Sequence, residues 1–297
     1  MTSNWPPVAE SEVPDYLVIG HVTKDLTPDG GYVIGGTVSF SSLTAQRLGK
    51  RAAVLTRCER LPDLREFLES QGVALHRVAA EETTTFENVY RDGARTQRIG
   101  PVAPPIPADA VPAAWRDAAV VHLGPVSQEV PAEIADSFPA STTIGVTPQG
   151  WLREWDESGR VHNGAPWRNA EAVLARVDAL IFSAEDVGGD EHLVERYCSM
   201  AKLAVVTDHR NGCTTWYGGA RRHFPAFDVA EVDPTGAGDV FATAFLLRYG
   251  ETQDPAEAAH YANCAASFVV EGRGIAVLPT PEQVAERLQT GKLRGAT

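Results

Sequence analysis

The chain has 297 residues, enough for one large α/β unit or about two average domains, and its 43% hydrophobic content supplies a core that excludes global disorder. Its 26 basic and 39 acidic side chains give a net charge of −13, which opposes binding to nucleic acid or to an anionic membrane surface. A small phosphorylated ligand stays compatible with this charge, because donors close to the ligand outweigh a distant field.

The four cysteines are scattered and form no Cys-x-x-Cys pair, so we expect free thiols in a reducing compartment. Residues 1–14 contain three prolines and no basic start followed by an apolar run, so we expect a flexible N-terminus without a secretory signal. No run of 18 apolar residues occurs, so no membrane-spanning helix is expected. These features predict a cytoplasmic protein.

Short apolar runs alternate with helical segments along the chain. Gly49 and Gly72 each follow a helical segment and fit left-handed helix C-caps. The expected strands are 16–20, 52–56, 120–123, 143–146, 179–182 and 203–207. The expected helices are 39–48, 63–71, 170–177, 191–200, 237–248, 256–270 and 281–288. This alternation predicts an α/β fold with a doubly wound, mostly parallel sheet flanked by helices.

Two segments break the alternation and read as β-hairpins. Strands at 83–90 and 94–99 flank Arg91-Asp92-Gly93, and a second hairpin centres on Asp29-Gly30-Gly31. They suit a small antiparallel sheet acting as a lid over a cleft, although an edge extension of the main sheet fits equally well. We therefore expect one domain over 15–297, with a lid inserted at approximately 26–36 and 83–100.

The stretch from Val232 to Phe245 carries the strongest chemical signal. Gly236 and Gly238 directly precede an apolar helical run, so they place free backbone N–H groups and a positive dipole end at a helix start. An anion can approach closely there, and Asp239 follows in the first turn as a carboxylate that we expect to be ionised at neutral pH. A plain helix start with a dipole-stabilised carboxylate is the alternative.

An anion cradle beside a carboxylate is what phosphoryl transfer to an alcohol requires, because the protein mainly positions groups and neutralises charge. The stretch Asp233-Pro-Thr-Gly-Ala-Gly-Asp239 also resembles the signature of the ribokinase-like (PfkB) family of sugar kinases. The resemblance implies ATP and Mg²⁺, an anion hole formed by Gly236, Ala237 and Gly238, and Asp239 as catalytic base. It also implies a monovalent-cation (K⁺) site near Asp233.

Further matches to this family concern the acceptor. Asp25 matches an acid that binds sugar hydroxyls, whereas Thr23 replaces the family's Asn; a turn or helix cap is the alternative for Asp25. Gly35 and Gly36 resemble the family's paired glycines, which let the backbone approach a substrate; a simple tight turn is the alternative. Phe40 stands where the family has another Asn, which argues against plain ribose and favours a cyclic polyol such as an inositol. Further candidate acceptor contacts are Asn88, Gln149 and Arg153, although a solvated face is the favoured interpretation of Arg153.

The remaining matches concern the donor. Ser183 and Asp186 resemble the family's Asn-x-x-Glu segment that holds Mg²⁺ through water, and a slip of one residue would put Glu185 in that role. The nucleotide-site resemblance covers Thr207, Gly212 and Asn263, together with Ser183. His209 replaces a family glycine and puts the contact to ribose or phosphate in question, and Asn263 has the alternative of bonding a neighbouring loop.

We expect an ATP-dependent kinase acting on a hydroxyl of a small sugar or cyclic polyol. A nucleoside kinase is the runner-up, with Phe40 or Phe86 as the extra aromatic contact. A non-catalytic sugar-binding regulatory protein is the rival from another class. The resemblance also implies that lid strands can pair between subunits in a homodimer. Walker A, Gly-x-Gly-x-x-Gly, His-x-x-x-His and Gly-x-Ser-x-Gly motifs are absent from the sequence.

Overall fold

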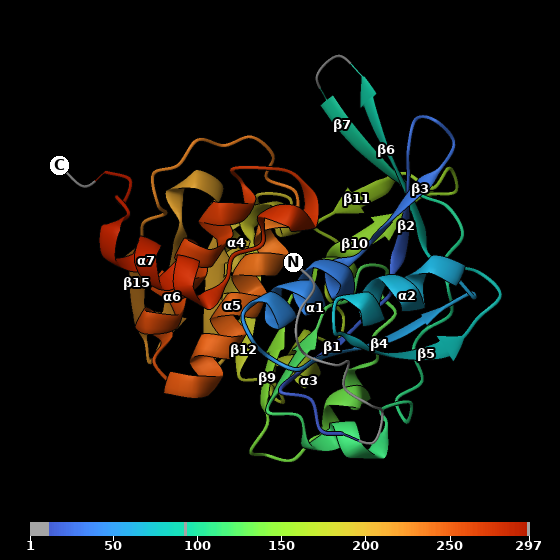
Figure 1. The fold of residues 1–297 in the computed structure, drawn as a ribbon, viewed down its shortest axis with the longest axis horizontal. Coiled ribbons are helices and arrows are strands. Elements are labelled where there is room, and N and C mark those ends of the chain that lie inside the picture. The colour runs from blue at the N-terminus through green and yellow to red at the C-terminus, as the bar shows by residue number, and fades with distance from the viewer. Residues whose placement is uncertain (1–11, 92–93, 296–297) are drawn as a thin grey trace.

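The computed structural model describes residues 12–91 and 94–295, which build a large twisted sheet covered by helices and a smaller sheet beside it (Figure 1). The large sheet has the order β15-β14-β13-β12-β9-β8-β1-β4-β5. Its strands are β1 (Tyr16–Ile19), β4 (Ala52–Cys58), β5 (Ala74–Ala79), β8 (Val120–Leu123), β9 (Thr143–Val146), β12 (Ala179–Ser183), β13 (Leu203–Thr207), β14 (Cys213–Tyr217) and β15 (Ala220–Phe224). All neighbours from β13 to β5 are parallel, and β14 and β15 add an antiparallel edge.

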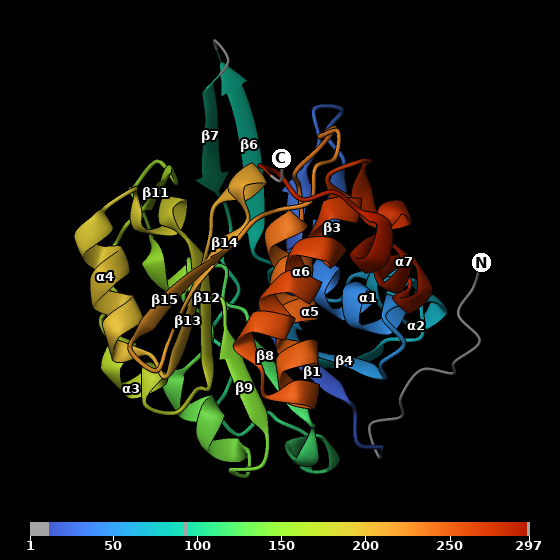
Figure 2. The same cartoon turned by 90° about the vertical axis from the view of Figure 1, so that its left-hand side faces the viewer.

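Helices cover both faces of this sheet, as Figure 2 shows. One face carries α1 (Thr37–Arg47), α2 (Pro62–Ser70), α5 (Ala237–Thr252), α6 (Pro255–Val269) and α7 (Pro281–Thr290), and the other carries α3 (Ala170–Leu174) and α4 (Glu191–Met200). Within β1, Tyr16 and Val18 join the first core, whereas Leu17 and Ile19 join the second. Strands buried on both faces explain the continuous apolar runs, and the predicted doubly wound α/β fold is confirmed.

The smaller sheet has the order β3-β2-β6-β7 and consists of β2 (Thr23–Leu26), β3 (Tyr32–Gly35), β6 (Thr85–Arg91) and β7 (Ala94–Ile99). Both hairpins are antiparallel as expected, but the central β2–β6 pairing is parallel, because both strands leave the large sheet in the same direction. These strands form a sheet of their own, so the alternative of an edge extension is wrong. The predicted Asp92-Gly93 turn and most of the predicted flexible N-terminus lie outside the described residues.

Several short elements escaped the sequence analysis. These are β5, β14 and β15, the hairpin β10 (Arg153–Trp155) and β11 (Val161–Asn163), and the short 3₁₀ helices η1 to η6 at Ala113–Asp117, Ala132–Ser137, Gln149–Leu152, Ala184–Val187, His209–Asn211 and Gly274–Val277. Helix α3 ends at Leu174, three residues before the expected end. The four cysteines are buried free thiols, as predicted. No helix within the described ranges is long and apolar enough to cross a membrane.

Candidate active site

A cavity of about 470 Å³ opens where the carboxyl ends of β12 and β13 meet the start of α5 and the smaller sheet. An adjoining cavity of about 300 Å³ shares the wall around Asp239, so the two form one cleft. Of the predicted site residues, the main cavity is lined by Thr23, Asp25, Gly36, Phe40, Gln149, Arg153, Ser183, Glu185, Thr207, Gly212, Gly236, Ala237, Gly238, Asp239 and Asn263. The fold therefore brings most of them together.

The start of α5 forms one wall of the cleft. Gly236 is its N-cap with φ +82°, and a Cβ there would lie 2.5 Å from two ring atoms of Phe40, so this position requires glycine. No side-chain cap is found on this helix start among the described residues, which leaves the positive dipole end facing the cavity. The Ala237 N–H donates to the Pro234 carbonyl at 3.1 Å, so one of the three predicted anion-hole amides already has a partner within the turn.

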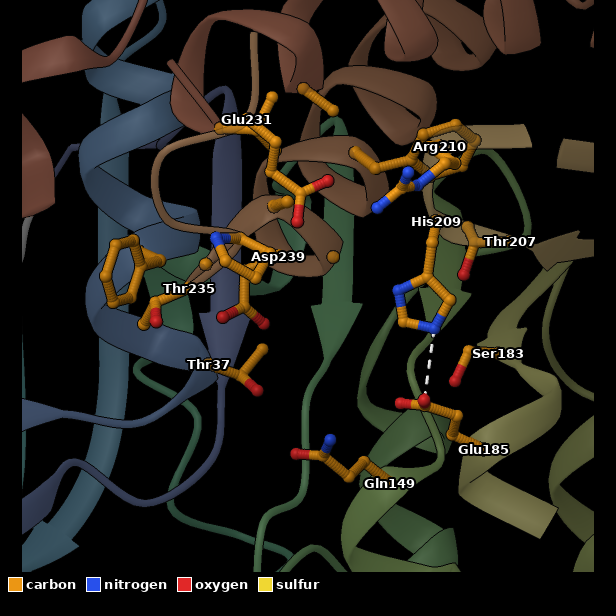
Figure 3. A pocket seen from close by; sticks show the side chains of 18 of the residues that line it. Thr37, Gln149, Ser183, Glu185, Thr207, His209, Arg210, Glu231, Thr235 and Asp239 are labelled. Carbon is orange, nitrogen blue, oxygen red and sulfur yellow. Dashed lines mark ion pairs between the residues drawn. The ribbon is translucent and has the colours of Figure 1, made fainter. Parts of the chain in front are cut away.

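Asp239 points into the same cleft from the first turn of α5, with Thr37 beside it (Figure 3). Burial raises its pKa to about 6, although a hydrogen bond from Thr37 and the positive charge of Arg153 oppose the rise, and Asp186 adds to it. The carboxylate keeps some solvent contact through the cavity, but protein atoms surround it on the remaining sides. The Asp239 carboxylate is mostly ionised at neutral pH. Its pKa lies close to the working pH, which suits proton exchange with an alcohol.

The end of the cleft that the sequence predicts to hold the acceptor is built by β2 and the β3–α1 link. The Thr23 hydroxyl donates to Asp25 Oδ1 at 2.9 Å and orients that carboxylate. A Cβ at Gly35 would lie 2.3 Å from Asp25 Oδ2, and one at Gly36 would lie 2.5 Å from the His21 carbonyl oxygen. Gly35 thus lets the backbone pack against Asp25, and Gly36 lets it pack against the backbone of residue 21. Gly35 supports the site without lining either cavity.

The smaller sheet closes this end with Phe86 and Gln97. The Arg153 guanidinium lies 5.7 Å from the centroid of the Phe86 ring, and its Nη1 donates to the Val126 carbonyl at 3.5 Å. Asn88 lines neither cavity and instead accepts a hydrogen bond from Gln97 at 3.3 Å. The sequence does not predict Gln97 as a site residue, because β7 contains several polar side chains and such a pattern is typical of a solvent-exposed strand.

The opposite wall carries Ser183, Thr207 and Gly212. His209 adopts a positive φ of 43°, the backbone conformation for which glycine is favoured. Its ring Nε2 lies 3.1 Å from Glu185 Oε1 (Figure 3). A Cβ at Gly212 would lie 2.1 Å from the Phe224 carbonyl oxygen, which explains the glycine there. The sequence motif marks His209 as a departure from the family but does not predict its partner.

Among the predicted metal residues, Asp233 lies apart from the neighbouring pair Glu185 and Asp186. Asp186 lines the second cavity, where its carboxylate caps the Ser183 N–H at 2.9 Å and accepts from Gln149 at 3.4 Å, while Glu185 lines both cavities. Asp233 lines neither, and its Oδ1 accepts from the Thr235 N–H at 2.9 Å. Residues 12–91 and 94–295 contain no cluster of three His, Cys, Asp or Glu side chains suited to a metal. A cation here would depend on one or two carboxylates and the ligand's own oxygens.

The end of the cleft next to α6 includes the apolar side chains of Val229, Ala266 and Val270. Asn263 borders it, but its amide donates to the carbonyls of Phe224 at 3.0 Å and Pro225 at 3.3 Å, in agreement with the alternative of bonding a neighbouring loop. Further lining residues that no motif predicts include Thr37, Thr147, Asn163, Arg210, Val229, Glu231, Ala266, Ser267, Val270 and Arg294. Most lie in loops or on helix faces that no local motif marks.

Comparisons with known proteins agree with this geometry. Residues 174–282 match the model of the PfkB family of carbohydrate kinases. The chain is 27% identical over 263 residues to a cytidine kinase of Thermococcus kodakarensis, covering 79% of this chain and 88% of that protein. It is 25% identical over 253 residues to an inositol 3-kinase of Zea mays, covering 77% of this chain and 65%, just under two thirds, of the relative.

A similar solved structure is a pyrophosphate-dependent kinase of the ribokinase family in complex with a pyrophosphate analog and myo-inositol. The two chains superpose with a TM-score of 0.72 and 25% identity, over 91% of this chain and 99% of that one. The same architecture thus serves different donors and acceptors, and the choice between them rests on the residues that line the cleft.

Proposed function

The chain belongs to the ribokinase-like PfkB family of carbohydrate kinases and is a phosphotransferase, and we propose that it transfers the γ-phosphoryl group of ATP to a hydroxyl of a sugar or cyclic polyol. The observation that carries this proposal is the meeting of Asp239 and the α5 N-terminus in one cleft with Asp25. Asp239 accepts a proton, the N-terminus of α5 attracts the transferring phosphoryl group, and Asp25 binds hydroxyls.

In this proposal Asp25 holds the acceptor by its hydroxyls and Asp239 takes the proton of the hydroxyl that attacks the γ-phosphorus. The bond from the γ-phosphorus to the β,γ-bridging oxygen breaks, and ADP leaves. The N-terminus of α5 offsets the negative charge of the moving group. The apolar end beside Val229, Ala266 and Val270 offers space for the adenine, which supports ATP over pyrophosphate as the donor.

The ATP-dependent members of the family typically use Mg²⁺, which neutralises charge on the donor phosphates. Glu185 and Asp186 would hold the ion on this chain, because both carboxylates face the cleft opposite Asp239. Two carboxylates suit Mg²⁺, which keeps several waters and completes its coordination with substrate phosphates. A K⁺ site near Asp233 stays a prediction from the resemblance.

A nucleoside acceptor is the second candidate. Phe40 and Phe86 both line the cleft and could pack against a planar base, and the similarity to a cytidine kinase supports this alternative. Asp25 serves either acceptor, because a ribose and an inositol both present neighbouring hydroxyls.

The decisive experiment measures ADP and phosphate release from ATP, and phosphate release from pyrophosphate, with panels of sugars, inositols and nucleosides. We expect one inositol or sugar to raise ATP turnover far above that with water alone. Selective stimulation by nucleosides would favour the second candidate. Turnover with pyrophosphate but not with ATP would contradict the proposal. So would the finding that no acceptor raises the rate of ADP release.

Asp239→Asn tests the role of the carboxylate. The amide keeps the shape but cannot accept the proton, so we expect turnover to fall by about two to four orders of magnitude while ATP and acceptor still bind. Calorimetric titration of the variant measures binding separately from turnover. Asp63→Asn serves as the matched control, because Asp63 is an exposed acid in the first turn of another helix, α2, and lines neither cavity. A near-native rate for Asp239→Asn would remove Asp239 from its proposed role.

A further inference from the structure

Glu129 is a buried carboxylate in the loop after β8, with only 1% of its surface exposed. Its oxygens accept the backbone N–H groups of His21 at 2.8 Å, Val126 at 3.0 Å and Ser127 at 2.7 Å. The Ser127 hydroxyl donates to it as well, at 3.2 Å. Removing this acceptor would leave three buried backbone donors without a partner, so the carboxylate holds these two segments together.

The His21 side chain extends the same network. Its Nε2 faces the Pro104 carbonyl at 3.1 Å and therefore carries the proton, so Nδ1 accepts from the Thr84 hydroxyl at 2.8 Å. Burial lowers the pKa of His21, which favours this neutral form. Thr84 in turn accepts the Ala103 N–H at 3.1 Å, and the network becomes continuous across three segments of the chain.

These segments are the connections between the large and the small sheet. His21 lies between β1 and β2, Thr84 immediately precedes β6, and Ala103 follows β7. Val126, whose N–H Glu129 holds, packs its side chain against Phe86 and Ile99 of the small sheet. One carboxylate thus fixes both the point where the small sheet begins and the surface on which it rests.

We propose that Glu129 is a positioning residue that sets the small sheet over the acceptor end of the cleft. Val126 and Phe86 line the cavity, whereas Glu129 does not, so its effect reaches the acceptor through them. When Glu129 is lost, the small sheet moves away from its seat, the acceptor is held less tightly and water enters beside Asp239. The functional part of this inference rests on the proposed kinase activity; the structural part does not.

The kinetic test compares Glu129→Gln with Glu133→Gln, an exposed carboxylate in the same segment. The amide introduced by Glu129→Gln keeps the shape but turns an NH₂ group toward backbone donors. We expect the KM for the acceptor to rise about tenfold or more, the KM for ATP to change less than about twofold, and ATP hydrolysis without acceptor to rise relative to transfer. Glu133→Gln should match the wild type. The proposal would be overturned if Glu129→Gln lowered kcat but left the acceptor KM unchanged and did not raise ATP hydrolysis without acceptor relative to transfer.

Hydrogen–deuterium exchange provides a readout that needs no acceptor. In Glu129→Gln we expect amides of β2 and β6 to exchange at least about tenfold faster while β8 and β9 stay protected. Unchanged protection of the small sheet, or equal loss in both sheets, would refute the positioning role. If Glu129→Gln does not fold, Val126→Ala replaces it. This variant removes the side chain on which the small sheet rests and keeps the hydrogen bonds of the Glu129 carboxylate. Faster exchange confined to the small sheet supports the proposal, and unchanged exchange there refutes it. Absence of kinase activity in the wild type would refute the proposed function alone.

Discussion

Asp239 shows how one residue is tuned by two opposing influences. A helix N-terminus stabilises a carboxylate, yet burial prevails and raises the pKa of Asp239 to about 6. If Asp239 acts as the base, kcat/KM should fall about tenfold per pH unit below 6, because only the ionised form accepts a proton, and should level off above pH 7. A pH–rate profile with saturating donor checks this, and a profile flat down to pH 5 would contradict it.

The same raised pKa has a consequence for stability. Ionising the partly desolvated Asp239 carboxylate costs free energy in the folded state. The contribution of protonated Asp239 to the free energy of unfolding is therefore complete below pH 4 and is lost as the pH rises through 6. Asp239→Asn should therefore be more stable than the wild type at pH 8, by about 1–2 kcal/mol after allowance for solvent screening, with the difference vanishing near pH 4. Urea unfolding at both pH values measures it; a variant that is less stable at pH 8 would refute the argument.

Sequence could predict Asp239 and Asp25 because each sits in a short local motif whose chemistry is self-contained. It could not predict how Asn263 is used, since its amide partners lie near residue 224, on a strand that sequence analysis missed. The contact of His209 with Glu185 likewise joins the 3₁₀ helices η4 and η5, which only the sheet order brings together. Residues whose roles depend on distant partners need the fold.

At the scale of elements, the turn into α5 depends on Gly236. Gly236→Ala would combine an unfavourable φ of +82° with a Cβ 2.5 Å from the Phe40 ring. We expect it to lower stability by about 2–3 kcal/mol and to lower kcat/KM by at least about tenfold, because the helix start would shift away from the donor. Thermal unfolding and steady-state kinetics measure the two effects.

Gly219→Ala is the matched control for that variant. Gly219 has a similar φ of +78° in the β14–β15 turn, with nothing within 4 Å of the added Cβ. It should cost only about 1 kcal/mol and leave the kinetics unchanged. If both variants behave alike, the contact between Phe40 and Gly236 has no role in the site.

Strands that are buried along their whole length, such as β8 and β9, could be predicted to the residue because few polar side chains occur in them. The polar edge strand β15 and the three-residue strands β10 and β11 carry no such pattern. Their pairing is decided by tertiary contact, for example the 2.8 Å hydrogen bond from the Ile99 N–H to the Gly159 carbonyl that sets the β10–β11 hairpin beside β7. The parallel β2–β6 pairing was missed for the same reason.

At the scale of the whole molecule, a net charge of −13 acts on every charged ligand that approaches the cleft. ATP carries several negative charges, so repulsion should raise its KM at low ionic strength, and screening should lower that KM about twofold to threefold between 10 and 100 mM salt. A neutral sugar, polyol or nucleoside feels no such field, and its KM should stay constant. The salt dependence of the acceptor KM therefore reports the acceptor's charge.

Tetramethylammonium chloride is the salt of choice, because it raises ionic strength without offering K⁺ to a cation site near Asp233. A KM for ATP that rises from the lowest salt concentration would mean that Arg210 and Arg294, which line the cleft, dominate over the net charge. In that case replacing Arg210 and Arg294 by Gln should make the KM for ATP fall as salt is added, since only the repulsion from the protein's net negative charge would remain. If the KM for ATP did not depend on salt in either protein, neither field would reach the donor and the electrostatic argument would fail.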